Sequence, residues 1–489
     1  MRKVIELQME FWKKDISQIK FDIKSRDEIP KLLMGLQYIY STPKVRAKVF
    51  KILKSIVPIK KHKVGRPGMD LWKILVLGTL RLNCNWDFDK VHEIANNHTK
   101  LRQMLGHSKT DFDSFYALQT IRDNIALLTP QILDEINQVI ITAGHSIIMT
   151  KKDPDLKGSC DSFVVETDVH YPTDTNLLFD AIRKMIFLIA IICSETGITE
   201  WRQSHHNILK AKRMLRSIQK LKRSTSKDKN KKAQREQFII KAHQNYMGVC
   251  RGFVSKTKET ISILRELGIL SISKNLRLST VEEYIRHAER QIDQIRRRVV
   301  LDEKIPHAEK VFSIFQPHTE WISKGKAGVP QELGLKVCIL KDQYGFILHH
   351  QVMEQQTDEK VAVAMAQGAK DRFPNLVGCS FDKGFYSTTS KEDVGKILDY
   401  VILPKKGRLS AKDKEIEHSE EFIKSRRKHS AVESSINALE NHGLDRCCDH
   451  GVHGFKRYVG LSVLARNIQI LGHLLQQKEL KRQKRRKAA

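Results

Sequence analysis

Strand-forming sequence in this 489-residue chain is concentrated in two regions that lie far apart. The first, residues 159–167, is short and rich in β-branched and aromatic side chains, which is typical of a strand. The second is a hairpin pattern, in which segments 333–340 and 346–353 flank a five-residue turn that ends in Gly345. Because strands are stable only when they pair, the two regions together predict one sheet that a long insert interrupts.

A helix over 360–369 and a strand over 376–381 are expected after the hairpin. The order strand, hairpin, helix, strand predicts a mixed α/β core, which we place within residues 155–475. Residues 176–325 are predicted to form a basic helical insert inside this core. The sequence therefore predicts an α/β protein with a mixed sheet.

Residues 1–150 are predicted to form a separate all-α domain that precedes the core. The segment 71–80 is apolar nearly all round, which is typical of a buried helix. Just before it, residues 64–68 read Val-Gly-Arg-Pro-Gly, in which Pro and Gly favour an extended chain. Arg66 could then enter an A·T-rich minor groove, although the same residues are more typical of a plain loop that leads into a helix.

The charge of the chain favours a polyanionic partner. Its 86 Lys and Arg residues exceed its 56 Asp and Glu residues by 30. Such an excess attracts nucleic acid or an anionic membrane surface. The longest uninterrupted apolar run, 185–193, is too short to span a bilayer and indicates a buried helix instead. Double-stranded DNA is therefore the expected partner, and no membrane association is expected.

The cellular compartment is predicted from the N-terminus and the cysteines. Glu6 and Glu10 interrupt the first apolar residues, which is unlike a signal peptide. The eight cysteines have no CxxC spacing, which does not favour a disulfide scaffold. We expect a cytoplasmic, nucleoid-associated bacterial protein.

Two basic segments are candidates for binding phosphate groups. From residue 201 to 235 the chain has 13 Lys or Arg and one acid, Asp228. This segment contains Lys210, Lys212, Arg213 and Arg216, which we predict to contact DNA; a solvated helix face would have the same composition. The terminal residues 476–489 form a second basic stretch, which is expected to be a frayed helix end that adds non-specific attraction.

A heptad pattern in the insert predicts a helix that packs along one seam. A capping-box pattern, Thr280 with Glu283, would start this helix. The seam is expected to close on another helix of the insert or on a second copy of the chain. Its apolar residues are Val281, Ile285, Ala288, Ile292, Ile295 and Val299.

Three acids are candidates for metal-dependent chemistry on phosphate esters. Two divalent cations can stabilise both the attacking and the leaving oxygen, and carboxylates are the ligands that such cations prefer. Asp161 lies in the first strand on the same face as apolar side chains, where an acid is costly unless it is paired or bound to metal. Asp382 ends the strand 376–381, a position where ligands gather in α/β sheets.

The third acid, Glu433, lies in a predicted helix that Gly443 would cap. Its polar face contains Arg426, His429, Glu433, Asn437 and Glu440, opposite a buried apolar stripe. A metal and phosphate site would have this mixture of bases and acids, and so would a solvated helix surface. Asp168 and Asp174 compete with Asp161 for the first position.

Three ordered segments resemble bacterial insertion-sequence DDE transposases of the ISNCY type. Residues 160–174 resemble the first catalytic strand, 380–387 the segment of the second aspartate, and 426–437 the glutamate helix. The similarity extends to residues 65–72 and 321–326, so that it covers most of the chain.

The resemblance implies an RNase H-like core and Asp161, Asp382 and Glu433 as catalytic residues that hold Mg²⁺ or Mn²⁺, with two ions expected. It also implies cleavage and strand transfer at the terminal inverted repeats of an insertion sequence, target DNA as a second substrate, and a homo-oligomer on DNA. Lys383, Arg426 and His429 are predicted to contact DNA beside the site. This chain departs from the family pattern at Arg426, His429 and Glu440, where related transposases often have Tyr, Arg and Lys.

Other functions remain open from the residues alone. A metal-dependent nuclease would use the same triad and stop at hydrolysis, and a non-catalytic DNA-binding protein would share the charge without the triad. A zinc site would draw on His442, Cys447, Cys448, His450 and His453, although adjacent cysteines chelate poorly and the spacing fits no standard finger.

Overall fold

The computed structural model divides the chain into two compact units. The first combines Met1–Asp168 with Glu320–Ala489, and the second is Val169–Thr319. The second unit lies close to the boundaries predicted for the insert. The structure describes residues 2–5, 14–57, 68–108, 114–149, 154–223, 228–267, 271–323 and 330–488.

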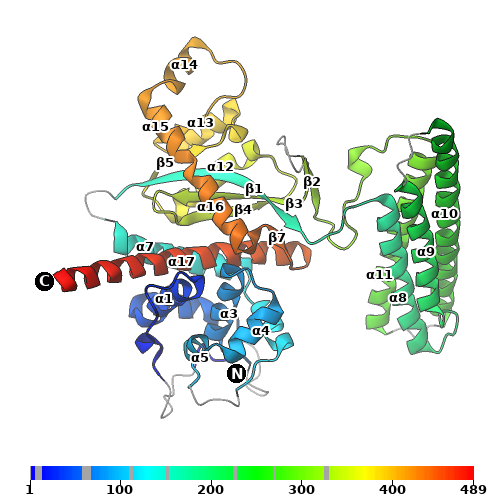
Figure 1. The fold of residues 1–489 in the computed structure, drawn as a ribbon, viewed down its shortest axis with the longest axis horizontal. Coiled ribbons are helices and arrows are strands. Elements are labelled where there is room, and N and C mark those ends of the chain that lie inside the picture. The colour runs from blue at the N-terminus through cyan, green and yellow to red at the C-terminus, as the bar shows by residue number, and fades with distance from the viewer. Residues whose placement is uncertain are drawn as a thin grey trace. The chain divides into compact units, whose positions relative to one another are not determined.

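The first unit is built on a mixed sheet with β1 (Leu156–Thr167) at its centre (Figure 1). On one side β3 (Gln331–Asp342) pairs antiparallel with β1, and β4 (Ile347–Met353) pairs antiparallel with β3. On the other side β5 (Leu376–Phe381) runs parallel to β1, and β6 (Tyr400–Ile402) runs parallel to β5. The predicted first strand, hairpin and 376–381 strand are therefore confirmed, as is the mixed α/β class.

Two short strands extend the sheet. β2 (Glu320–Ser323) pairs with the start of β3, and β7 (Arg446–Cys447) pairs with the end of β1. The chain enters the second unit directly after β1 and returns directly before β2. The insert thus leaves the pairing of β1 with β3 intact.

Helices follow the strands on the C-terminal side of the hairpin. They are α12 (Asp358–Arg372), α13 (Thr388–Ile397), α14 (Ala411–Glu417), α15 (Glu420–His429) and α16 (Ala431–Leu439).

The single helix predicted from Arg426 to Gly443 is wrong, because α15 ends at His429 and α16 begins at Ala431. The Ser430 hydroxyl donates to the Arg427 carbonyl, a local bond that competes with the helical ladder. Gly443 lies in a π-helical turn, Glu440–Leu444, with a positive φ of 101°.

The N-terminal part of the first unit is helical, as predicted. Its helices are α1 (Glu28–Ser41), α2 (Pro43–Lys54), α3 (Leu71–Asn83), α4 (Phe88–Asn97), α5 (Thr99–Met104), α6 (Leu118–Ile125) and α7 (Pro130–Ile148). In α3 only Lys73 is not fully buried, which agrees with the apolar pattern of the segment.

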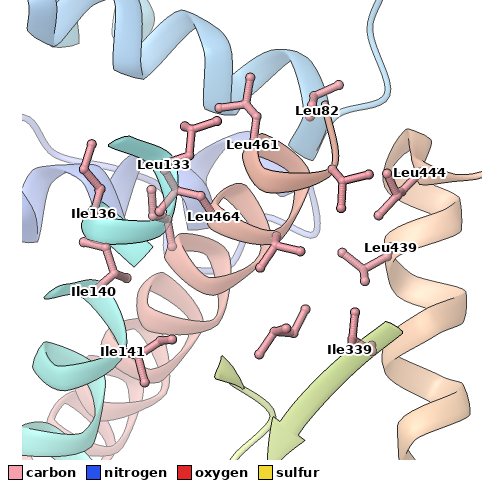
Figure 2. Packing of buried hydrophobic residues seen from close by; sticks show 14 of the residues in the cluster. Leu82, Leu133, Ile136, Ile140, Ile141, Ile339, Leu439, Leu444, Leu461 and Leu464 are labelled. Carbon is pink, nitrogen blue, oxygen red and sulfur yellow. The ribbon is translucent and has the colours of Figure 1, made fainter. Parts of the chain in front are cut away.

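A boundary near residue 150 does not separate two compact units. The long helix α17 (Gly451–Ala488) packs against α1, α3 and α7, and it contains the basic stretch 476–488 as its own end. Glycines 35 and 472 permit a close approach of α1 and α17, because a Cβ at either position would clash with a carbonyl of the other helix. Figure 2 shows the apolar core that α3, α7, α16, α17 and β3 build together.

A buried ion cluster also joins the N-terminal helices to the start of α17. The Asp449 carboxylate accepts from Arg81 of α3 at 3.0 Å and from Arg457 of α17 at 2.8 Å. Only 4% of the Arg81 side chain and 8% of the Asp449 side chain are exposed. A hydrogen-bonded buried pair of this kind is costly to break from one side, so the cluster holds the two parts of the unit together.

In its described residues, the second unit is a bundle of four α-helices with its own apolar core. They are α8 (Asp174–Thr196), α9 (Ser204–Lys222), α10 (Lys229–Glu266) and α11 (Ile272–Ile295). Five of the six predicted seam residues are buried on α11, which packs mainly against α8, so that the seam closes within the unit. The sixth, Val299, lies in the π-helical turn Arg296–Val300 that follows α11 and is only partly buried. The predicted start of this helix at Thr280 is wrong. Ser271 caps the helix, and the Thr280 hydroxyl donates to Leu276 inside it.

Candidate catalytic site

Asp161 and Asp382 are brought level by the register of two parallel strands. β1 and β5 pair Cys160 with Phe381, and each aspartate is the next residue along its strand. Asp161 is half-buried, whereas Asp382 follows the last residue of β5 and is exposed. The two carboxylates therefore lie at the carboxyl end of β5, the edge where ligands commonly gather in α/β sheets.

Glu433 reaches the same edge from α16. This helix packs against β1 and buries Val432, Ser435, Ile436 and Leu439, which leaves Glu433 exposed on its other side. The charges of Asp382, Asp358 and Glu433 all raise the pKa of Asp161. The three predicted acids thus come close enough to interact, although long stretches of sequence separate them.

Burial is the main reason that the pKa of Asp161 is raised to about 6, and the three neighbouring carboxylates add to the effect. The backbone N–H of Ser162 donates to the Asp161 carboxylate at 2.7 Å and opposes the rise. A cation beside Asp161 would remove most of the cost of its charge. The arrangement therefore favours binding of a positively charged ligand.

A polar row across three strands tethers the junction between α15 and α16. The register places Lys341 of β3, Ser159 of β1 and Ser380 of β5 next to one another. The Lys341 ammonium donates to the Ala431 carbonyl at 2.7 Å, and the Ser380 hydroxyl is 3.0 Å from Nδ1 of His429. These two contacts fix the chain directly before Glu433.

His429 is part of this tether, and its imidazole interacts electrostatically with two of the carboxylates. Burial lowers its pKa, and the charges of Asp382 and Glu433 raise it. Its Nε2 atom is buried and has no hydrogen-bond partner among the described residues. The structure thus places His429 beside the acids, held by Ser380.

A fourth carboxylate, Asp358, lies at the same edge and was not among the predicted site residues. It is the first residue of α12, where its carboxylate accepts from the Ser162 hydroxyl at 2.6 Å and pairs with Lys336 of β3 at 3.0 Å. A Cβ on Gly384 would lie 3.3 Å from Asp358 Oδ2 and 3.6 Å from Asp382 Oδ2, so the two carboxylates flank this glycine. An acid in the first turn of a helix is so common that the sequence alone gave no reason to select it.

No protein-family model, curated protein or solved structure matches this chain. The function proposed below therefore rests on the residues of the chain itself.

Basic side chains lie in and against the turn that follows Asp382, and a further one lies on α15. Lys383 is exposed in the short turn Lys383–Phe385 that follows Asp382, and Arg426 is exposed on α15. The Lys406 ammonium, which was not predicted, donates to the Gly384 carbonyl at 2.7 Å. A phosphate group at this edge would lie near both basic and acidic side chains.

The other predicted residues lie elsewhere or outside the described part of the chain. Lys210, Lys212, Arg213 and Arg216 are exposed on α9 of the second unit. Arg66 falls outside the described residues.

The two competing aspartates have other partners. Asp168 follows the far end of β1, about 20 Å along the strand from Asp161, and lies 3.7 Å from Arg446. Asp174 belongs to the second unit, where it opens α8 and pairs with Arg298 at 2.8 Å. The structure therefore groups Asp161, and not Asp168, with Asp382.

The donor set of the site consists of oxygen atoms, which suit Mg²⁺ or Mn²⁺ by their chemistry. Across the described ranges, no three His, Cys, Asp or Glu side chains are already arranged to hold an ion. In the region considered for zinc, His442 contacts the Asn83 carbonyl and the Cys447 thiol contacts the Asp449 carbonyl.

Among the helices that the structure describes, none has the length and apolar character needed to cross a bilayer.

Proposed function

We propose that this chain is a DDE transposase, which cuts DNA at the ends of an insertion sequence and joins those ends to target DNA. The observation that carries the proposal is the convergence of Asp161, Asp382 and Glu433 at one edge of the sheet. A strand, the end of a neighbouring strand and a helix each contribute one acid. The three segments that contain these residues resemble the family motifs in the same order.

Divalent cations, when bound, would stabilise the attacking and leaving oxygens of an in-line displacement at phosphorus. Asp161, Asp382 and Glu433 would hold them, with Mg²⁺ or Mn²⁺ as the expected ions. In cleavage, water would attack the phosphorus at the end of the element, and the P–O3′ bond would break to leave a 3′ hydroxyl and a 5′ phosphate. In strand transfer, this hydroxyl would attack a phosphodiester of the target, so that a new P–O bond forms while the P–O3′ bond of the target breaks and frees a target 3′ hydroxyl. The polar row Lys341, Ser159 and Ser380 would keep Glu433 in place during both steps.

The fold supports an RNase H-like assignment as part of this proposal. The sheet has three antiparallel strands followed by two parallel ones in the order β4-β3-β1-β5-β6, with a helix before β5 and another before β6. The first and second acids then lie on adjacent central strands. This placement is compatible with the core that the family resemblance implies.

DNA is the proposed substrate because of the charge on the chain and around the site. The net charge is +30, Lys383 directly follows Asp382, and Lys406 donates to the Gly384 carbonyl beside it. Cations beside an acidic metal site can hold the phosphate backbone while the acids hold metal. Recognition of terminal inverted repeats, assembly of several copies on DNA and residence in the bacterial cytoplasm are further parts of the proposal.

The proposal is tested by strand transfer. Purified protein is mixed with a labelled duplex that bears the end of the element, a supercoiled target plasmid and Mg²⁺. We expect a joined product in which the 3′ end of the labelled DNA strand is linked to the plasmid. A parallel reaction without divalent metal is expected to give no product.

The alternatives give different results in the same assay. Cleavage without joined product would favour a nuclease. Binding of the duplex without cleavage, in Mg²⁺ and also in Mn²⁺, would favour a non-catalytic DNA-binding protein. Each of these outcomes would contradict the transposase proposal.

A further inference from the structure

Cations of the helical bundle in the second unit differ in whether they are paired with acids. One end contains the C-terminal part of α9 and the start of α10, and the other contains the C-terminal part of α10 and the start of α11. Basic residues occur at both ends. At the first of these ends, cations that follow α11 are paired, Arg298 with Asp174 and Arg297 with Glu303, whereas the exposed cations of α9 have no salt bridge among the described residues.

At the end that includes the start of α11, the cations are matched with acids. Lys258 pairs with Glu289, Arg265 with Glu282, and Arg277 with Glu195, each at 2.6 Å. Lys256 donates to the Glu200 carbonyl and lies over the Trp201 ring. This end of the bundle has little positive charge to offer a ligand.

At the opposite end, α9 presents a row of exposed cations. Arg213, Arg216 and Lys220 are spaced three and four residues apart, so they share one face of the helix. This face is opposite the buried side chains Ala211, Leu215 and Ile218. No salt bridge within the described residues involves any of the three cations. We call these three residues the basic row.

The start of α10 adds further positive charge next to this row. The first fully buried side chain of α10 is His243, so the helix begins with more than ten residues that do not enter the core. Lys231 and Lys232 are exposed there, and the only acids at this start are Asp228, which caps the helix, and Glu236. A helix start without buried contacts is stabilised little by the bundle, which is consistent with a role in binding.

We propose that the basic row on α9, together with the start of α10, binds the sugar–phosphate backbone of duplex DNA without reading its sequence. The identity of the partner rests on the proposed function, whereas the residues of the surface belong to the second unit and the carboxylates to the first. Lys210 and Lys212 flank the row and would contribute less.

The dimensions and chemistry of the row fit a duplex. Arg213 and Lys220 are seven residues apart, which is about 10 Å along the helix. A duplex carries about six phosphate charges over the same length of its axis. The exposed apolar side chains near the row are the isolated Leu209 and Phe238, and such isolated residues do not form the apolar face that insertion into a lipid surface requires.

The test measures DNA affinity in the full-length protein without metal. The probe is a fluorescent 30-base-pair duplex of random sequence, and the background variant Asp382→Asn prevents cleavage. Arg213, Arg216 and Lys220 are all changed to Gln, and the affinity is followed as a function of NaCl. We expect about a tenfold or larger loss of affinity, and a fall of about 2 to 3 in the slope of log affinity against log salt.

Two controls separate the surface from general charge and from folding. Lys258, Arg265 and Arg277 changed to Gln remove the same charge from the matched end, and we expect the salt slope to stay unchanged. A charge-conserving variant, Arg213→Lys with Arg216→Lys, should keep most of the affinity. Circular dichroism should show the same helix content in all variants.

An equal loss in both triple variants would mean that only net charge matters and would overturn the proposal. An unchanged affinity in the basic-row variant would overturn it as well, and so would a loss confined to duplex RNA or to vesicles with phosphatidylserine. The binding assay tests the basic row, and the strand-transfer assay tests the carboxylate site. A failure of this proposal is therefore distinguishable from a failure of the proposed function.

Discussion

The carboxylate site of the first unit and the basic row of the second both concentrate charge of one sign, but they hold it differently. Asp161, Asp358, Asp382 and Glu433 come from four elements, and hydrogen bonds to Lys341, Ser162 and Ser380 position those elements. The basic row comes from one helix, and helical periodicity alone aligns it. The comparison indicates that the first region positions its carboxylates accurately, as a catalytic site requires. The second region only needs to attract a negatively charged partner.

Both regions concentrate like charges, and in the carboxylate site the cost of doing so is visible. The raised pKa of Asp161 reports that its charge is unfavourable where it lies. Other charges of the first unit are neutralised locally, as in the buried cluster of Asp449 with Arg81 and Arg457. Unneutralised charge is therefore expected to mark the places where ligands bind.

The largest expected effect comes from changing one acid of the triad. Asp161→Asn, Asp382→Asn or Glu433→Gln should each lower strand transfer by about a thousandfold or more, because each removes a ligand of the ions that stabilise the transition state. Affinity for DNA in the absence of metal should stay within a factor of about three, since the basic surfaces are intact. Near-normal activity of any one variant would remove that residue from the triad.

Changing Asp358 should have a smaller effect, because this carboxylate already has a cation partner. We expect Asp358→Asn to raise the Mg²⁺ concentration needed for half-maximal activity by about tenfold, as loss of a residue that orients metal ligands does. The matched control is Asp371→Asn at the other end of α12, where the aspartate accepts from Gln367 of the same helix. If both variants had equal metal requirements, Asp358 would have no positioning role.

The smallest expected effect is a pH-dependent change in stability. Asp161 has a pKa of about 6 in the folded protein and an ordinary value of 3.8. Its proton therefore favours the folded state, and this contribution is lost as the pH rises through about 6. Without metal, Asp161→Asn should be more stable than the unchanged protein above pH 6, on the order of 2 kcal/mol.

The difference should vanish below about pH 4, where the carboxyl is protonated in both the folded and the unfolded state. Thermal unfolding of both proteins from pH 4 to 8 measures it. Saturating Mn²⁺ should restore the stability of the unchanged protein and leave the variant unaffected. Equal stability of the two proteins at every pH would mean that ionisation of Asp161 does not destabilise the folded state.

The strands of the sheet were predictable from sequence because each strand is indicated by neighbouring residues in the chain. β1, the β3–β4 hairpin and β5 follow from alternation, β-branched residues and the turn before Phe346. The position of Asp382 at the end of β5 follows directly. Local patterns also identified α3 and the seam of α11.

Features that depend on tertiary contacts were not predictable. The tether at the junction of α15 and α16 depends on Lys341, which contacts Ala431 across 90 residues of sequence, and its position depends on the register of three strands. Asp358 resembled an ordinary residue of a helix start. The union of the N-terminal helices with the sheet depends on α17, whose packing partners lie hundreds of residues away in sequence.

The central claim is that Asp161, Asp382 and Glu433 share bound divalent metal, and metal-directed cleavage of the protein tests it most directly. Fe²⁺ is added in place of Mg²⁺ with ascorbate and peroxide, so that radicals cut the backbone near the bound ion, and mass spectrometry locates the cuts. We predict three clusters of cuts, around residues 161, 382 and 433, that excess Mg²⁺ suppresses. Cuts around Asp168 in place of Asp161, or no cuts that Mg²⁺ suppresses, would contradict the claim.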